Sequence, residues 1–178
     1  MPKGPFIDAG WKTLQESESV EGSGQCVGLV QRSGGSGAPP TGKWVAGKRV
    51  LDAKPGEIAA GTVIATFWCG RYPSHSSGNH AALYVSHAQP TEKAAGWIEV
   101  VEQWTAVTYV PKDGGGKQRV ATPYAPKAAR AERGGKGHIR GQPKLFVQAK
   151  QQDGVCTPNE MPRMSNVAEY YHVVMAED

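Results

Sequence analysis

Side chains that together support nucleophilic chemistry occur in order along the chain. Cys26 begins an apolar run after Ser23-Gly24-Gln25. We expect Ser23 to cap a short helix, with Cys26 about three positions past the cap, in the first turn. His80 opens a strand-like stretch, and Glu102 and Gln103 lie in the next one. A thiolate attacks an amide carbonyl, an imidazole pairs with it and protonates the leaving amine, and a carboxylate or amide orients the imidazole. The order therefore favours a cysteine nucleophile with a histidine partner.

The expected position of Cys26 at a helix start would activate its thiol. Free amide hydrogens and the positive end of the helix dipole stabilise a thiolate and lower the pKa of a cysteine. The same amides, including that of Cys26, are placed to hold an oxyanion. Leu29 and Val30 share the face of Cys26, which places the helix against a core and the sulfur at its rim. The alternative is that Cys26 is one more small buried hydrophobic residue.

The partner of His80 depends on strand geometry. Side chains alternate across a sheet, so Glu102 points to the side of Val100 and Trp104, and Gln103 points to the opposite side. Only one of the two can therefore reach the imidazole. The residues alone leave both choices open.

The elements that must position these residues are mainly strands. Stretches 61–67, 79–85, 97–104 and 169–175 are rich in β-branched and aromatic residues. Short connections favour an antiparallel meander. Within 79–85, alternate residues are expected to face one core and the others the opposite side. With a short helix before these strands, the pattern predicts an α+β fold, in which Trp44 is a core residue or a wall of a peptide cleft.

Charge is unevenly distributed over a chain whose 178 residues fit one domain, 1–178. Residues 112–150 carry ten Lys or Arg and two acidic residues, a surplus of +8; because the whole chain is +4, the remainder is −4. We expect a basic, glycine-rich insertion at about 112–166, with 144–149 as its only strand-like part. It is either a solvated loop or a surface for nucleic acid, an acidic envelope polymer or an acidic protein.

We expect neither a metal nor a cofactor. The cysteine and the two histidines that lie near His80 in the sequence lack the paired spacing of a zinc site. Three cysteines allow a free Cys26 and a disulfide between Cys69 and Cys156, should the chain reach an oxidising compartment.

Three segments resemble the motifs of CHAP and NlpC-type cysteine amidases, which cut peptidoglycan peptides: Gly24-Gln25-Cys26, Asn79 to Val85, and Val101 to Trp104. With Trp44-x-x-Gly47, 61–67 and the late strand at 169–175 added, the chain resembles amidase effectors delivered by type VI secretion systems more closely still. The likeness covers about 20–110 and 165–175. It implies a papain-like NlpC/CHAP fold, in which an N-terminal helix carrying the cysteine packs on a small antiparallel sheet.

The resemblance also implies roles for individual residues. Cys26 matches the nucleophile, His80 the general base and Glu102 the orienting residue. CHAP enzymes typically read E-Q-N-W where this chain reads Glu102-Gln103-Trp104, so the usual asparagine is missing and Gln103 is the alternative partner of His80. The residues expected to contact the substrate are Gln25, Trp44 and Asn79.

The implied activity is a cysteine amidase acting on peptidoglycan stem peptides, with the cross-link from D-alanine to diaminopimelate favoured over the bond from γ-D-glutamate to diaminopimelate. The alternatives are a non-catalytic basic module that binds cell wall or nucleic acid, and a cysteine protease or acyltransferase of the same fold. For an amidase we expect no nucleic-acid partner.

Localisation and partners follow from the N-terminus and from the resemblance. The first residues include no apolar segment, and no stretch approaches a membrane span. We therefore expect a monomer made in the cytoplasm without a signal peptide. An envelope substrate then implies export by a secretion apparatus, action in the periplasm of a target bacterium and a cognate immunity protein.

Overall fold

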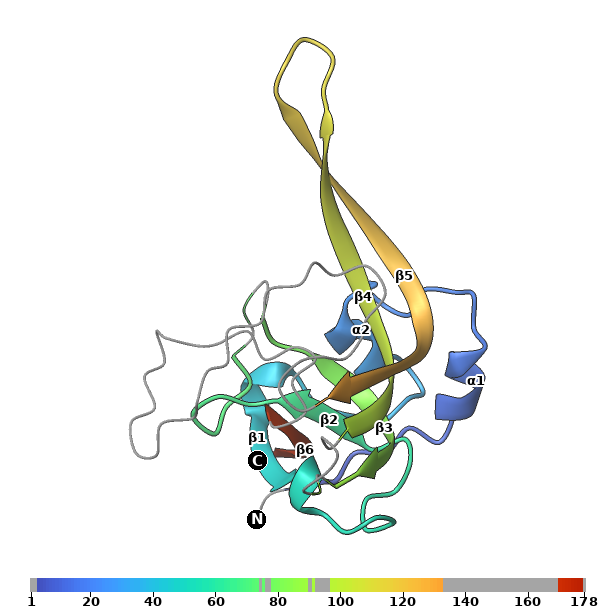
Figure 1. Cartoon of the computed structure of the whole chain (residues 1–178), viewed down its shortest axis with the longest axis vertical. Helices are drawn as coiled ribbons and strands as arrows, with labels where there is room; N and C mark the ends of the chain where they lie inside the picture. Colours follow the sequence, from blue (N-terminus) through green and yellow to red (C-terminus); the bar gives the residue numbers. More distant parts are fainter. Residues whose placement is uncertain are drawn as a thin grey trace.

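The computed structural model describes residues 3–73, 75, 78–89, 91, 97–132 and 170–177, except for the side chains of 106, 107 and 129–132. Within these residues, a six-stranded antiparallel sheet forms the centre of the molecule and the helices are short (Figure 1). No helix formed by the described residues is long and apolar enough to cross a membrane.

The sheet contains the predicted meander. Its strands are β1 (Trp44–Arg49), β2 (Val63–Thr66), β3 (Ala81–Ala88), β4 (Trp97–Pro111), β5 (Lys117–Glu132) and β6 (Tyr171–Ala176). The strands are arranged in the order β1-β6-β2-β3-β4-β5, and all neighbours are antiparallel. The four expected strands are present as β2, β3, β4 and β6, whereas β1 and β5 were not predicted. Because β6 inserts between β1 and β2, the last described element completes the middle of the sheet.

The described helical elements are α1 (Trp11–Gln15), α2 (Cys26–Val30) and the 3-10 turns η1 (Thr41–Lys43) and η2 (Val50–Asp52). α2 packs on β3 and β4, and α1 lies against β4 and β5. The segments that flank these helices are joined by an ion pair, in which Arg32 Nη2 donates to the buried Asp8 Oδ1 at 2.9 Å and Arg32 Nε to Oδ2 at 3.1 Å. The N-terminal segment is thereby fixed beside α2.

Both faces of the sheet around β3 are buried, although only one face of the strand at 79–85 was expected to meet a core. Along β3, Ala82 and Tyr84 enter one hydrophobic cluster, and Ala81 and Leu83 enter a second one. η2 and the residues after it cover the first cluster, and α2 with the N-terminal segment covers the second. A strand that is buried on both faces is apolar at almost every position. Its sequence therefore does not show whether one face or both faces contact a core.

The basic segment contains a strand directly after its first turn, which corrects the prediction that only 144–149 of this segment is strand-like. β4 and β5 form a hairpin around the turn 112–116, whose three glycines all have positive φ. β5 is the outer strand of the described sheet and contains Pro123 and Pro126. An edge strand tolerates proline, because the missing N–H can lie on the side without a neighbour. These prolines concealed the strand in the sequence.

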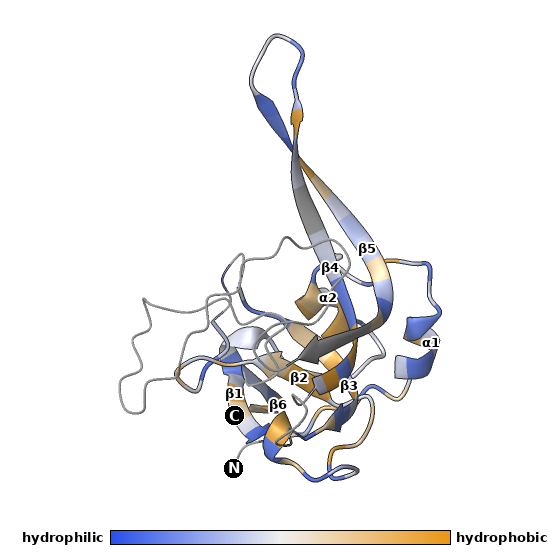
Figure 2. Cartoon of the chain, viewed as in Figure 1, coloured by the Kyte–Doolittle hydropathy of each residue, from blue (hydrophilic) through white to orange (hydrophobic). Residues whose placement is uncertain are grey.

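The distal part of this hairpin, residues 106–122, projects from the rest of the described chain and is called the arm below (Figure 1). Hydrophilic residues predominate near its tip (Figure 2). The rest of the predicted insertion, including the expected strand at 144–149, lies outside the described residues. The assignment of 1–178 to a single domain stays a prediction.

Candidate active site

α2 begins at Cys26, because Gln25 has an extended backbone (φ −89°, ψ 159°) and is the N-cap. Ser23 is therefore not the cap that the sequence predicted. Its Oγ accepts a hydrogen bond from the amide of Gln25 at 3.4 Å within the loop. The first amides of a helix have no acceptor inside the helix. The main-chain N–H of Cys26 therefore makes no hydrogen bond within α2, and it lies close to the thiol of the same residue.

The loop before Cys26 folds back onto α2, and this contact requires glycine. A Cβ at Gly28 would lie 2.6 Å from Ser23 Oγ and 2.9 Å from the Ser23 amide nitrogen. Gly22 has a φ of +51°, and its Cβ would lie 2.9 Å from the Gly28 carbonyl oxygen. Glycine tolerates both the positive φ and the close approach of the two backbones. The loop and the first turn of α2 therefore form one packed unit that fixes Cys26.

His80 immediately precedes β3 and is held through both its backbone and its ring. Its amide donates to Thr66 Oγ1 at 2.9 Å, and its carbonyl accepts from the Thr66 amide at 2.9 Å. Its Nε2 lies 2.7 Å from Oε2 of Glu102, and both side chains are buried. The other carboxylate oxygen, Oε1, has no hydrogen-bond partner within the described residues. Because Nε2 faces Glu102, Nδ1 is the ring nitrogen that remains for Cys26.

Cys26 and His80 stabilise each other in their charged forms. Burial raises the pKa of the Cys26 thiol, but the positive charge of His80 and hydrogen bonds from His80, the Ala81 amide and Tyr72 outweigh burial and lower that pKa. Burial lowers the pKa of His80, but the negative charges of Cys26 and Glu102 raise it to about 10. Between these two pKa values the pair is a thiolate and an imidazolium. This is the reactive form of a cysteine nucleophile, and Cys26 is only partly buried.

Tyr72 is a residue of the site that the sequence analysis missed. Its hydroxyl lies 4.0 Å from Cys26 Sγ and accepts a hydrogen bond from Asn79 Nδ2 at 2.8 Å. Burial and the charge of Cys26 raise the pKa of Tyr72, so the phenol keeps its proton. Because Asn79 donates to the phenol oxygen, the phenol hydrogen can point at the sulfur. The sequence offered no sign of this contact, which joins residues 46 positions apart.

The residues predicted to contact substrate have different surroundings. Trp44 is 1% exposed, donates from Nε1 to the Pro39 carbonyl at 2.7 Å and packs edge-to-face on Tyr72 with ring centroids 5.0 Å apart. It is thus placed as a core residue, the first of its two predicted positions, and it supports Tyr72. Asn79 contacts Tyr72, as described above. Only Gln25 of the three presents an exposed side chain beside Cys26.

Gln103 turns away from His80 and holds the loop before Cys26. Its Oε1 accepts from the Glu21 amide at 2.7 Å, and its Nε2 donates to the carbonyls of Glu21 at 2.7 Å and Gln25 at 3.3 Å. The side chain is fully buried. The residue that contacts the imidazole is therefore Glu102.

The cysteines in the described part of the chain are in different states. Cys69 is disulfide-bonded, and Cys26 is free. Cys156, the predicted partner of Cys69, lies outside the described residues, so this pairing stays a prediction. Across the described part of the chain, no three His, Cys, Asp or Glu side chains are grouped so that they could hold a metal ion.

A cysteine, a histidine and a carboxylate brought together beside an antiparallel sheet define a candidate cysteine hydrolase. Residues 11–111, more than half of the chain, match the family model "Domesticated amidase effector 2" (Dae2). The chain belongs to this family of amidase effectors.

Two relatives extend the match to almost the whole chain. The chain is 36% identical over 170 residues to a type VI secretion amidase effector 2 protein of Salmonella typhi, which covers 96% of this chain and 98% of that protein. A solved structure of type 6 secretion amidase effector 2 (Tae2) matches with a TM-score of 0.62 at 32% identity, covering 98% of this chain and 97% of the other. The predicted likeness to type VI secretion amidase effectors is thereby confirmed.

Proposed function

We propose that this chain is an antibacterial effector that hydrolyses an amide bond in the peptide part of peptidoglycan, with Cys26 as the nucleophile. The observation that carries the proposal is the buried 2.7 Å contact between His80 Nε2 and Glu102, beside a thiol whose pKa is lowered by His80. The family and the relatives, which are amidase effectors by name, support the reaction class. A cysteine on a helix and a histidine at a strand start, with an acid on the next strand, support a papain-like arrangement of the NlpC/CHAP type.

The reaction starts when the Cys26 thiolate adds to the carbonyl carbon of the amide. The carbonyl oxygen becomes an oxyanion, for which the main-chain N–H of Cys26, an amide that α2 does not use, is a donor. His80, as an imidazolium, gives its proton to the leaving amine, and the C–N bond breaks to leave a thioester on Sγ. Neutral His80 then takes a proton from the water that attacks the thioester, which releases the carboxylic acid and restores the thiolate. Glu102 orients the ring and stabilises the imidazolium in both steps.

For the scissile bond, we propose the cross-link between D-alanine and diaminopimelate. The likeness to type VI effectors supports this choice over the bond between γ-D-glutamate and diaminopimelate. We also propose that the protein is a monomer made in the cytoplasm, is delivered by a secretion apparatus into the periplasm of a target bacterium and is inhibited by a cognate immunity protein that covers Cys26.

Digestion of purified sacculi tests the proposal. Wild-type protein and Cys26→Ala are incubated with sacculi, and the muropeptides are identified by mass spectrometry. We expect the wild type alone to convert cross-linked dimers into monomers ending in D-alanine. Stem peptides ending at γ-D-glutamate would reassign the bond. Intact muropeptides together with wild-type protein retained on sacculi would replace the amidase by a binding module.

A further inference from the structure

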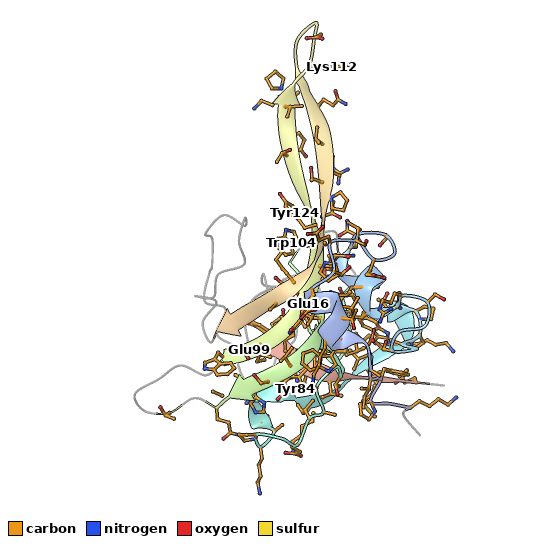
Figure 3. All side chains as sticks on the ribbon, turned by 90° about the vertical axis from the view of Figure 1, so that its right-hand side faces the viewer. Glu16, Tyr84, Glu99, Trp104, Lys112 and Tyr124 are labelled. Atoms are coloured by element: carbon orange, nitrogen blue, oxygen red, sulfur yellow. The ribbon has the colours of Figure 1, made fainter. Side chains whose placement is uncertain are left out.

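Two stacked aromatic rings and a lysine lie at the root of the arm. The rings of Trp104 and Tyr124 stack with centroids 5.2 Å apart and an interplanar angle of 21°. Lys127 Nζ lies 5.4 Å from the centroid of Trp104 and 5.6 Å from that of Tyr124. Figure 3 shows Trp104 and Tyr124 where the arm leaves the body, with Lys112 towards its far end. We call Trp104, Tyr124 and Lys127 the aromatic–lysine cluster.

Strand register connects this cluster to the His80–Glu102 pair. Lys127 is opposite Glu102 and Tyr124 is opposite Trp104 in the β4–β5 ladder, with a register shift between the two pairs. Glu102 and Trp104 are two residues apart on β4, so they point to the same face, about 7 Å apart along the strand. The extra residue of β5 bends that strand locally. The cluster therefore continues the surface on which Glu102 meets His80.

The cluster presents a cation and an aromatic ring to solvent. Trp104 is 7% exposed, whereas Tyr124 is 40% exposed and Lys127 is exposed. An exposed ammonium group held over two rings is complementary to an anion.

We propose that the aromatic–lysine cluster binds a carboxylate of the peptide substrate next to the scissile amide. This proposal rests on the proposed function. Diaminopimelate carries a carboxylate on the same carbon as the amine that a cross-link acylates, so an anion lies directly beside that bond. Lys127 pairs with the carboxylate, and the exposed ring of Tyr124 packs on the adjoining aliphatic chain. Lys127 thus adds binding affinity and takes no part in proton transfer.

A matched pair of variants tests the proposal. Lys127→Gln and Lys112→Gln each remove one positive charge from the same hairpin. Lys127 lies in the cluster, and Lys112 lies towards the tip of the arm. We expect Lys127→Gln to raise KM for a cross-linked muropeptide about fivefold and to leave kcat within about twofold, because an exposed ion pair contributes equally to the ground state and the transition state. Lys112→Gln should match the wild type, and Lys127→Arg should restore KM. High salt should reduce the difference.

A substrate with its carboxylates converted to primary amides identifies the bound group. Its KM with the wild type should rise to the value of Lys127→Gln, and Lys127→Gln should cause no further loss on it. The proposal is overturned if KM is unchanged in Lys127→Gln, if the loss is the same on both substrates, or if Lys112→Gln causes an equal loss.

A binding measurement separates this proposal from the proposed function. If the wild type cleaves no muropeptide, the proposed function fails, and the cluster is tested in the Cys26→Ala background by calorimetry with the same muropeptide. There, a Kd raised about fivefold by Lys127→Gln, with an unchanged melting temperature, supports the carboxylate site. An unchanged Kd overturns it.

Discussion

The two faces of β4 serve the same site in different ways. On one face, Glu102 places a carboxylate against His80, and Trp104 continues that surface towards the arm. This face acts through charge, since the carboxylate is one of the causes that raise the pKa of His80 to about 10, against its burial.

The opposite face of β4 acts through position. Gln103 makes three hydrogen bonds to main-chain atoms of the loop before Cys26, and Thr105 Oγ1 donates to the Gly24 carbonyl at 2.9 Å. A Cβ at Gly24, which has a φ of +76°, would lie 2.7 Å from Pro123 Cβ, so the loop also packs directly on β5. None of these groups touches the imidazole.

Substitutions of neighbouring residues in β4 should therefore have different effects on the protein. Loss of the carboxylate should change how activity depends on pH, whereas loss of the loop support should change stability. Only the nucleophile and its base should be indispensable for turnover.

The largest effect is expected from Cys26→Ala and His80→Ala. Each should lower kcat/KM for muropeptide cleavage by at least about 10³-fold, because the nucleophile and the base act as one unit. The double variant should be no worse than either single variant. His75→Ala, which removes an exposed histidine, is the matched control and should retain activity. An active Cys26→Ala protein of native melting temperature would contradict the assignment of the nucleophile.

Replacing the carboxylate should give the second largest effect. We expect Glu102→Gln to lower kcat/KM at least about tenfold, because the amide keeps the shape but not the charge. The carboxylate raises the pKa of His80, so its removal should lower that pKa from about 10. Turnover needs the imidazolium, and the high-pH limb of the pH–rate profile should therefore move to lower pH. A limb that stays in place would show that Glu102 does not act on His80.

Gln103→Met should mainly affect stability. It leaves the Glu21 amide and two carbonyls without their side-chain partner, and we expect a loss of about 2 kcal/mol in the free energy of unfolding. Urea unfolding measures this loss as a lower midpoint at an unchanged slope. Turnover should fall only a few-fold, and the high-pH limb should not move. A limb displaced as in Glu102→Gln would transfer the orienting role to Gln103.

Local pattern selected Cys26 and His80, which the structure brings together, but it did not predict their surroundings. Both residues stand at element boundaries, which turn and strand signals mark to within a few residues. Strand alternation predicted that Glu102 and Gln103 point to opposite faces of the sheet. It could not tell which of the two faces His80, because both faces are buried around β3 and carry the same apolar pattern. Tyr72 was missed because its contact with Cys26 spans 46 residues and depends on how the loop after β2 packs on Trp44. No periodicity records such a contact.

The smallest effect should come from the Tyr72 hydroxyl, which touches the same sulfur without belonging to either face of β4. Its hydrogen bond is one of the causes that lower the pKa of Cys26. Tyr72→Phe keeps the ring that packs on Trp44, so the pKa of Cys26 should rise while the fold is retained. Alkylation of Cys26 by iodoacetamide, followed across pH by peptide mass spectrometry, should show a midpoint moved to higher pH and a rate about threefold lower below it. Tyr84→Phe is the matched control, because that hydroxyl contacts His87 Nδ1 at 2.7 Å in the other hydrophobic cluster. A midpoint that moves equally in both variants, or in neither, would show that Tyr72 does not act on Cys26. The thiolate would then be stabilised by His80 and the Ala81 amide alone.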